Sequence, residues 1–135
     1  MKKLLPLFFF VILSACSNSA DMEVAKQAVR DFHDQLDAGQ FQALYNQSSD
    51  DLKKMASEKE FIALLDAVHR KLGVTKSFEL KERSVMYEVS GATMTLNYET
   101  VYAEGNAQES FVYRLKDDKA ILYGYHINSN TLITK

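Results

Sequence analysis

The chain has very few of the residues that cross-link or interrupt a small domain. Among its 135 residues there are one cysteine, one proline, five glycines and no tryptophan. A single cysteine excludes a disulfide within the chain, so the fold must be held together by its hydrophobic core. A chain of this length is one domain, which can bury roughly two-thirds of the surface that it exposes when unfolded.

The sequence also lacks a strong charge excess and the common catalytic motifs. Sixteen Lys and Arg residues are set against 18 Asp and Glu residues, which gives a formal charge of −2 at pH 7. Nucleic-acid-binding proteins concentrate basic residues on one face, so nucleic acid is not an expected partner. There is no G-x-S-x-G, H-E-x-x-H or C-x-x-C motif and no glycine-rich phosphate loop. We therefore expect no cofactor.

The N-terminal segment has the layout of an export signal. Lys2 and Lys3 precede an apolar run over residues 4–13, which is too short to span a bilayer. The following Leu13-Ser14-Ala15-Cys16 overlaps its end and resembles the lipobox of bacterial lipoproteins. The resemblance implies that residues 1–15 are a cleaved signal peptide and that Cys16 is the lipidated first residue of the mature chain.

The lipobox resemblance predicts a location in the cell envelope, with the membrane as a partner through the lipid anchor. Ser17 stands where lipoproteins retained in the inner membrane typically carry aspartate, so the periplasmic face of the outer membrane is favoured for a Gram-negative source. Residues 16–21 are predicted to form the lipidated cysteine and a short flexible tether, and residues 22–135 a single domain. The alternative is an ordinary secretory signal, which would leave an unpaired thiol in an oxidising compartment.

The first half of the domain has the periodicity of helices. Apolar residues recur every three or four positions in two long stripes, and a glycine follows each stripe as a C-terminal cap. Ser57 and Glu60 form a capping box at the start of the second long stripe. We expect helices over residues 22–37, around residues 41–45, in a short turn that reaches Met55, and from Ser57 to residue 72.

After Gly73 the apolar period changes from helical spacing to alternation, and β-branched and aromatic residues become frequent. The short turns between the alternating segments predict an antiparallel meander with one face toward the helices. The sequence therefore predicts an α+β fold in which N-terminal helices pack on a curved four-stranded antiparallel sheet. The strands are expected over residues 76–89, 92–103, 107–116 and 120–129.

Alternation along these strands places several tyrosines toward the helices. In the last strand it places Tyr123 and Tyr125 on that face and Leu122 on the other. A buried phenol needs a hydrogen-bond partner, or it costs about 1–3 kcal/mol. Two interpretations stay open: rings buried at the rim with hydroxyls in water, or an open cone with an aromatic pocket for a small apolar ligand. The predicted pocket residues are Tyr98, Tyr113, Tyr123 and Tyr125, and Tyr102 shares their face.

His33 and Asp37, with Asp34 between them, are the first candidates for metal binding. Their spacing along a helix could offer two ligands, which are too few for a closed zinc site. We interpret them as an exposed polar helix face and predict no metal site.

The other two histidines are weak candidates for a catalytic base. His69 lies beside Asp66 and Arg70, at a spacing that is typical of pairs on a helix surface. Alternation places His126 on the sheet face away from the helices, where it does not reach a pocket between helices and sheet. We therefore predict no catalytic residue.

Five short segments carry a resemblance to a known family. They are Leu36–Phe41 (LDAGQF), Asp51–Lys53 (DLK), Ser57–Phe61 (SEKEF), Arg70–Gly73 (RKLG) and Leu122–Ile127 (LYGYHI). Over about residues 22–130 the chain resembles the DUF4019-type lipoproteins. The resemblance implies a cone of the NTF2-like or cystatin-like fold group. The tryptophan that usually starts the last strand in that family is absent, and Ala120-Ile121 stands there.

Three hypotheses for the function follow. The first is a membrane-anchored, non-enzymatic domain that binds a small ligand or an envelope protein. The second, allowed by the resemblance, is a SnoaL-like isomerase or hydrolase with His69 or His126 as the base inside the cone, and an inward-facing His–Asp pair would favour it. The third is a structural or inhibitory module that binds a partner and no ligand. The sequence does not predict an oligomeric state.

Overall fold

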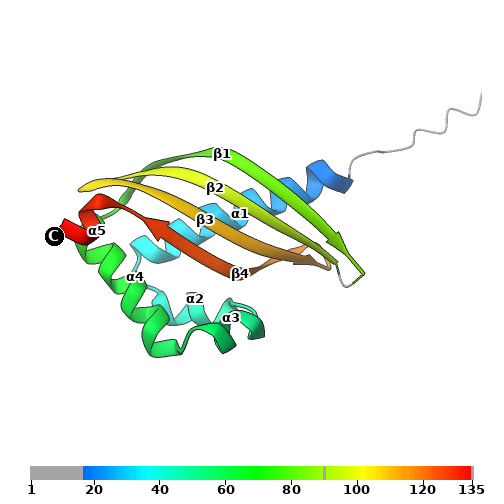
Figure 1. Cartoon of the computed structure of the whole chain (residues 1–135), viewed down its shortest axis with the longest axis horizontal. Helices are drawn as coiled ribbons and strands as arrows, with labels where there is room; N and C mark the ends of the chain where they lie inside the picture. Colours follow the sequence, from blue (N-terminus) through cyan, green and yellow to red (C-terminus); the bar gives the residue numbers. More distant parts are fainter. Residues whose placement is uncertain (1–16, 90, 135) are drawn as a thin grey trace, which may run out of the picture.

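The computed structural model describes residues 17–89 and 91–134 (Figure 1). They form an α+β fold in which four helices precede an open four-stranded antiparallel sheet, as predicted. The predicted signal peptide and Cys16 lie outside the described residues. The elements are α1 (Ser17–Asp37), α2 (Phe41–Gln47), α3 (Asp50–Met55), α4 (Glu58–Leu72), β1 (Thr75–Glu88), β2 (Gly91–Tyr102), β3 (Gly105–Lys116), β4 (Lys119–Asn128) and α5 (Asn130–Thr134).

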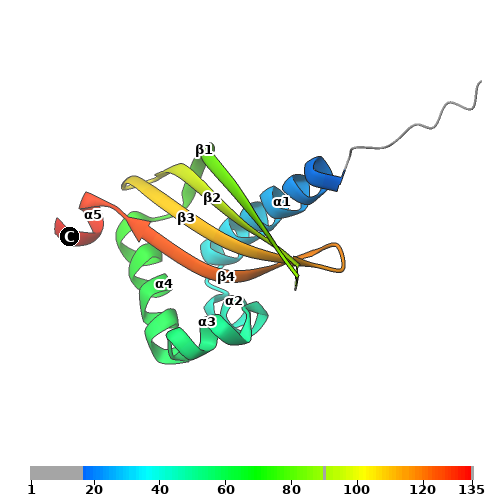
Figure 2. The ribbon, with the colours of Figure 1, turned by 45° about the vertical axis from the view of Figure 1, so that its right-hand side comes forward.

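The sheet is a meander in which each strand pairs with the next, in the order β1-β2-β3-β4. The long helix α1 runs across one face of the sheet, while α2, α3 and α4 lie beyond its β4 edge (Figures 1 and 2). Among the described elements, no helix covers the opposite face. One face therefore belongs to the core and the other is open to solvent.

Local signals in the sequence account for most helix ends. Ser49 caps α3 by accepting a hydrogen bond from the Leu52 amide, and Ser57 and Glu60 form the predicted capping box of α4. Gly39 and Gly73 follow α1 and α4 with φ values of 72° and 77°, a conformation that glycine adopts without strain. Within the described part of the chain, no helix is long and apolar enough to cross a bilayer.

The first helix begins earlier than predicted. Residues 17–21, expected to belong to a flexible tether, form the first turns of α1. Met22 and Ala25 are already buried in the core, at 6% and 0% exposure, so packing holds the helix in place near its start. The described part of the helix thus includes the whole segment from Ser17 that was expected to be a tether.

Strand β4 departs from the predicted alternation. Tyr113 pairs with Leu122 but Val112 pairs with Gly124, so Tyr123 is an extra residue in a β-bulge. An extra residue reverses the alternation on one side of the bulge. Leu122 is therefore buried at 7% exposure. Tyr123 is turned away from α1: its ring lies under the guanidinium of Arg114, 5.7 Å from the ring centroid, and its hydroxyl is close to Asp51 of α3. The prediction is wrong for Leu122, which faces the core, and Tyr123 reaches the helices only at the β4 edge, beside Asp51 of α3.

Phe111 of β3 lies at the centre of the core. Its ring centroid lies 5.0 Å from that of Phe32 on α1 and 5.2 Å from that of Tyr125 on β4. Four of the five tyrosines predicted to face the helices do so. They are Tyr98, Tyr102, Tyr113 and Tyr125, with exposures of 5%, 2%, 3% and 8%.

Candidate functional site

A cluster of polar side chains is buried between α1 and the sheet. His33 Nε2 lies 2.8 Å from Glu109 Oε1, and both residues are 1% exposed. The hydroxyls of Tyr102 and Tyr125 donate to the other carboxylate oxygen, Glu109 Oε2, at 2.9 and 2.5 Å. One helix and three strands thus each contribute one side chain to the cluster, and all of these contacts meet at the carboxylate of Glu109.

The surroundings of Glu109 favour its charged form. Burial raises the pKa of this carboxyl, but the hydrogen bond and charge of His33 outweigh that effect, so the pKa is lower than its ordinary value. The hydroxyls of Tyr125 and Thr100 act in the same direction, although Thr100 Oγ1 does not meet the geometry of a hydrogen bond. Because a carboxylate can only accept, we assign the contact with His33 as a hydrogen bond in which Nε2 donates to Glu109 Oε1.

The two tyrosines of the cluster remain neutral. Burial first, and the charge of Glu109 second, raise the pKa of both Tyr102 and Tyr125 far above the ordinary value. Both hydroxyls therefore keep their protons and act as donors. The carboxylate thus accepts from three donors, His33 Nε2 and the two neutral hydroxyls, as a buried charge requires.

The prediction of an exposed polar helix face is wrong for His33. This residue lies four positions after Val29 and three before Leu36, so it belongs to the buried stripe of α1. Glu109 likewise shares the inward alternation of Phe111 on β3. Both signals are present in the sequence, because a polar residue at a core position of an apolar stripe indicates a buried partner. Asp37 accepts hydrogen bonds from the backbone and hydroxyl of Thr75, both at 3.0 Å.

A cavity on the helix side of the sheet is small. It measures about 120 Å³ and is lined by residues of α1, α2, β3 and β4, including Phe32, Tyr113 and Leu122. Ligand pockets usually measure about 300–1,000 Å³. Of the four tyrosines predicted to line a pocket, Tyr113 alone borders this cavity. The structure therefore does not bring Tyr98, Tyr113, Tyr123 and Tyr125 together around one space.

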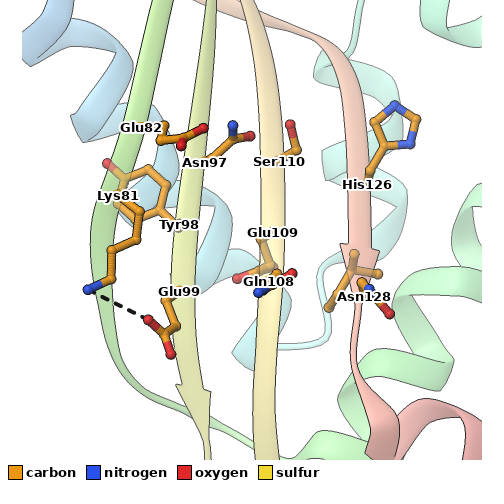
Figure 3. Close-up of a pocket in the computed structure, with 11 residues that line it drawn as sticks. Lys81, Glu82, Asn97, Tyr98, Glu99, Gln108, Glu109, Ser110, His126 and Asn128 are labelled. Atoms are coloured by element: carbon orange, nitrogen blue, oxygen red, sulfur yellow. Dashed lines mark ion pairs between the residues drawn. The ribbon is translucent and has the colours of Figure 1, made fainter.

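A larger groove of about 460 Å³ lies on the open face of the sheet. Figure 3 shows two rows of polar side chains that cross the strands there. In the first row, Glu82 pairs with Asn97, Asn97 with Ser110, and Ser110 with His126. In the second row, Glu99 pairs with Gln108 and Gln108 with Asn128.

The spacing of these rows follows from sheet geometry. Neighbouring side chains within a row are about 5 Å apart, and residues two positions apart on one strand are separated by about 7 Å. Tyr98, Glu109 and Ile127 also border the groove, but they alternate with the outward residues and face the core. The exposed lining therefore consists of amides, carboxylates, a hydroxyl, an imidazole and the ammonium of Lys81.

Most of the charge in the groove is paired. Lys81 Nζ lies 3.1 Å from Glu79 Oε2 and 3.6 Å from Glu99 Oε2, the second contact being drawn in Figure 3. The hydrogen bond and charge of Glu79, and then those of Glu99, raise the pKa of Lys81. The one ammonium of the groove is thus neutralised from two sides, which leaves hydrogen bonding as the main chemistry of this surface.

The other two histidines lie outside the buried cluster. His126 lies on the open face, as predicted, and His69 packs against the ring of Phe41 at 5.8 Å. Asp66 and Arg70 form the predicted surface pair at 2.8 Å. Within residues 17–89 and 91–134, no three His, Cys, Asp or Glu side chains are grouped so that they could hold a metal ion.

Comparison with known proteins gives one family. No curated protein matches the chain. Residues 28–125 match the family described as "Protein of unknown function (DUF4019)", a stretch that includes His33, Glu109 and most of the groove. Because the match extends from α1 to β4 and covers more than half of the sequence, the chain belongs to the DUF4019 family.

Proposed function

We propose that the protein is a membrane-anchored, non-enzymatic binding domain whose ligand lies across the two polar rows on the open face of the sheet. The observation that carries this proposal is the alignment of hydrogen-bonding side chains across all four strands, over a groove of about 460 Å³. That volume lies within the usual range for ligand sites. The cavities between the helices and the sheet are smaller, about 120 Å³ beside α1 and about 270 Å³ between β4 and helices α3 and α4, the second bordered by Tyr123 and Tyr125.

The ligand that fits this chemistry is a saccharide chain. Amide side chains both donate and accept, and carboxylates accept, which suits a ligand whose many hydroxyls do both. Lys81 is already paired with two carboxylates, so an anionic ligand would have to compete with both for the ammonium. Protein interfaces usually depend on buried aromatic or arginine side chains, and the outward-facing groove residues include no Tyr, Phe or Arg. A saccharide is therefore favoured over a protein partner.

The inward-facing His33–Glu109 pair is the feature that would favour an enzyme. A general base must reach the proton that it removes. Both residues are 1% exposed, and both oxygens of Glu109 already accept hydrogen bonds within the cluster. The cluster consists of His33, Tyr102, Glu109 and Tyr125, and so includes neither His69 nor His126, the two bases that the resemblance allows. We therefore propose that the pair stabilises the core and does not take part in catalysis.

The same proposal includes the fold group and the location. A long helix across a curved meander supports the NTF2-like or cystatin-like group. The lipobox Leu13-Ser14-Ala15-Cys16 supports a lipid anchor, and Ser17 supports the periplasmic face of the outer membrane in a Gram-negative source. An anchored domain with a polar open face is suited to hold a saccharide of the cell envelope close to the membrane.

Removing amides from the groove is expected to weaken saccharide binding. Each of Asn97→Ala and Gln108→Ala should raise the dissociation constant about 2- to 12-fold, because one net hydrogen bond contributes about 0.5–1.5 kcal/mol. Binding of purified envelope glycan fragments is measured by calorimetry, and backbone amide NMR shifts locate the site. Thr95→Ala is the matched control, since Thr95 lies on the same face of β2 outside the groove. Equal binding by the groove variants and the control would refute the proposed site.

The anchor is tested separately at its one cysteine. In cells, Cys16→Ser is expected to abolish lipidation and leave the precursor uncleaved, because the serine hydroxyl cannot replace the thiol as acyl acceptor in this pathway. Intact mass of the membrane-extracted wild-type chain should show residues 16–135 with acyl groups. A mature chain that starts at Cys16 with an unmodified thiol would contradict the anchor and leave the groove experiment unaffected.

A further inference from the structure

The hairpin between β1 and β2 ends in an exposed tip where three apolar side chains flank Glu88, whose carboxylate is paired with Arg114 of β3 at 3.4 Å. Met86 and Tyr87 are 62% and 61% exposed, and Val89 is fully exposed. Eight large apolar side chains of the described residues are exposed, and these three lie within four positions. Single exposed apolar residues are common on protein surfaces, but a cluster at one point indicates an interaction site.

The position of the tip indicates what it contacts. In Figures 1 and 2 the β1–β2 hairpin ends at the same end of the molecule as the start of α1, and α5 lies at the opposite end. Helix α1 begins at Ser17, the residue after Cys16. A lipid on Cys16 would therefore be attached next to a helical residue, without a long tether. The membrane that holds the anchor is then adjacent to the apolar tip.

We infer that Met86, Tyr87 and Val89 insert into the interface of the membrane to which Cys16 is attached, and so form a second contact with the lipid surface. This inference rests on the lipid anchor of the proposed function. Tyrosine is suited to the membrane interface because its ring is apolar and its hydroxyl is polar. A tip of three side chains is also small for a stable protein interface, which buries about 1,200–2,000 Å² in total.

The two contacts together would fix the orientation of the domain. With the anchor at the start of α1 and the tip of β1–β2 both in the membrane, the sheet cannot rotate freely about the lipid. Asn97 and Glu99 lie six and eight residues along β2 from Gly91 at the tip, which places the groove about 20–26 Å further along the strand. The open face is thus held away from the lipid headgroups.

The absence of tryptophan makes a direct test available. Val89→Trp introduces a single tryptophan into the full lipidated chain, which is reconstituted into vesicles of phosphatidylethanolamine and phosphatidylglycerol. Its fluorescence emission should shift to the blue relative to that of the same protein in detergent-free buffer without vesicles. Lipids brominated on their acyl chains should quench the emission. Ile133→Trp on α5 is the matched control, because Ile133 is an apolar residue with 79% exposure at the opposite end. Its emission should show neither effect.

A second variant excludes insertion driven by the new tryptophan itself. Met86→Lys combined with Val89→Trp should lose most of the blue shift and quenching, because a charge at the tip opposes burial in lipid. If the indole of the Val89→Trp variant emits and is quenched like that of the Ile133→Trp control, the second contact is refuted. Intact mass of the same sample reports acylation of Cys16, so a failure of the anchor is distinguished from a failure of the tip. An unmodified Cys16 overturns both.

Discussion

Replacing His33 with leucine is expected to lower the free energy of unfolding by about 3–5 kcal/mol, the usual result of leaving a buried charge without one of its partners. Glu109 would stay in the core with only the Tyr102 and Tyr125 hydroxyls as donors to its charge. Urea denaturation followed by circular dichroism measures the change, with the slope against urea concentration used to check that the transition stays two-state.

Removing the charge of Glu109 should relieve part of this loss. In the double variant His33→Leu/Glu109→Gln, the amide carries no charge and its oxygen still accepts from the two tyrosines. We therefore expect the double variant to be more stable than His33→Leu alone, which gives a favourable coupling energy in the double-mutant cycle. If His33→Leu changes the free energy of unfolding by no more than about 0.5 kcal/mol, as surface substitutions do, the contact between His33 and Glu109 does not stabilise the fold.

The pH dependence of stability gives an independent measure of the same pair. The pKa of Glu109 is lower in the folded protein than its ordinary value of 4.5. The unfolded chain therefore takes up the proton first, and stability falls as the pH drops below 4.5 toward the folded pKa. Above 4.5 the contribution of this group is fully present. Glu109→Gln should show a smaller loss of stability over this acid range than the wild type.

The helices and turns were predictable because their signals are local. The capping box of Ser57 and Glu60 and the glycines at 39 and 73 act within a few residues, so the boundaries of α4 and the end of α1 agree with the prediction. The start of α1 did not agree. The residues of its first turn are small and polar and carry no helix signal of their own. The helix is held there by the burial of Met22 in the core, which depends on residues far away in the sequence.

The site depended on information that alternation alone does not contain. The bulge at Tyr123 reverses the faces of β4, and its position is determined by pairing with β3. Alternation correctly placed Asn97 and Glu99 on the open face, but only the register between strands aligns them with Ser110 and Gln108. The buried pair of His33 and Glu109 joins residues 76 positions apart, so neither residue could be interpreted without the other.

Replacing Phe111 with alanine is expected to lower the free energy of unfolding by about 3–5 kcal/mol, the range for deleting a buried aromatic ring. Phe111 is 0% exposed and is the bulkiest of the fully buried side chains. Its ring contacts Phe32 and Tyr125 at centroid distances of 5.0 and 5.2 Å, so a cavity at this position would border α1 and β4 at once. The same contacts hold Tyr125 toward Glu109. Urea denaturation measures the loss.

The neighbouring Val112 supplies the control for Phe111, because it lies on the same strand and points to the open face. Val112→Ala should cost about 1 kcal/mol or less, since a partly exposed side chain leaves no enclosed cavity when it is shortened. The large difference between adjacent positions follows from the core lying on one face of the sheet only. Similar losses at both positions would mean that the open face is also covered, and the groove across Asn97 and Gln108 would then not be accessible to a ligand.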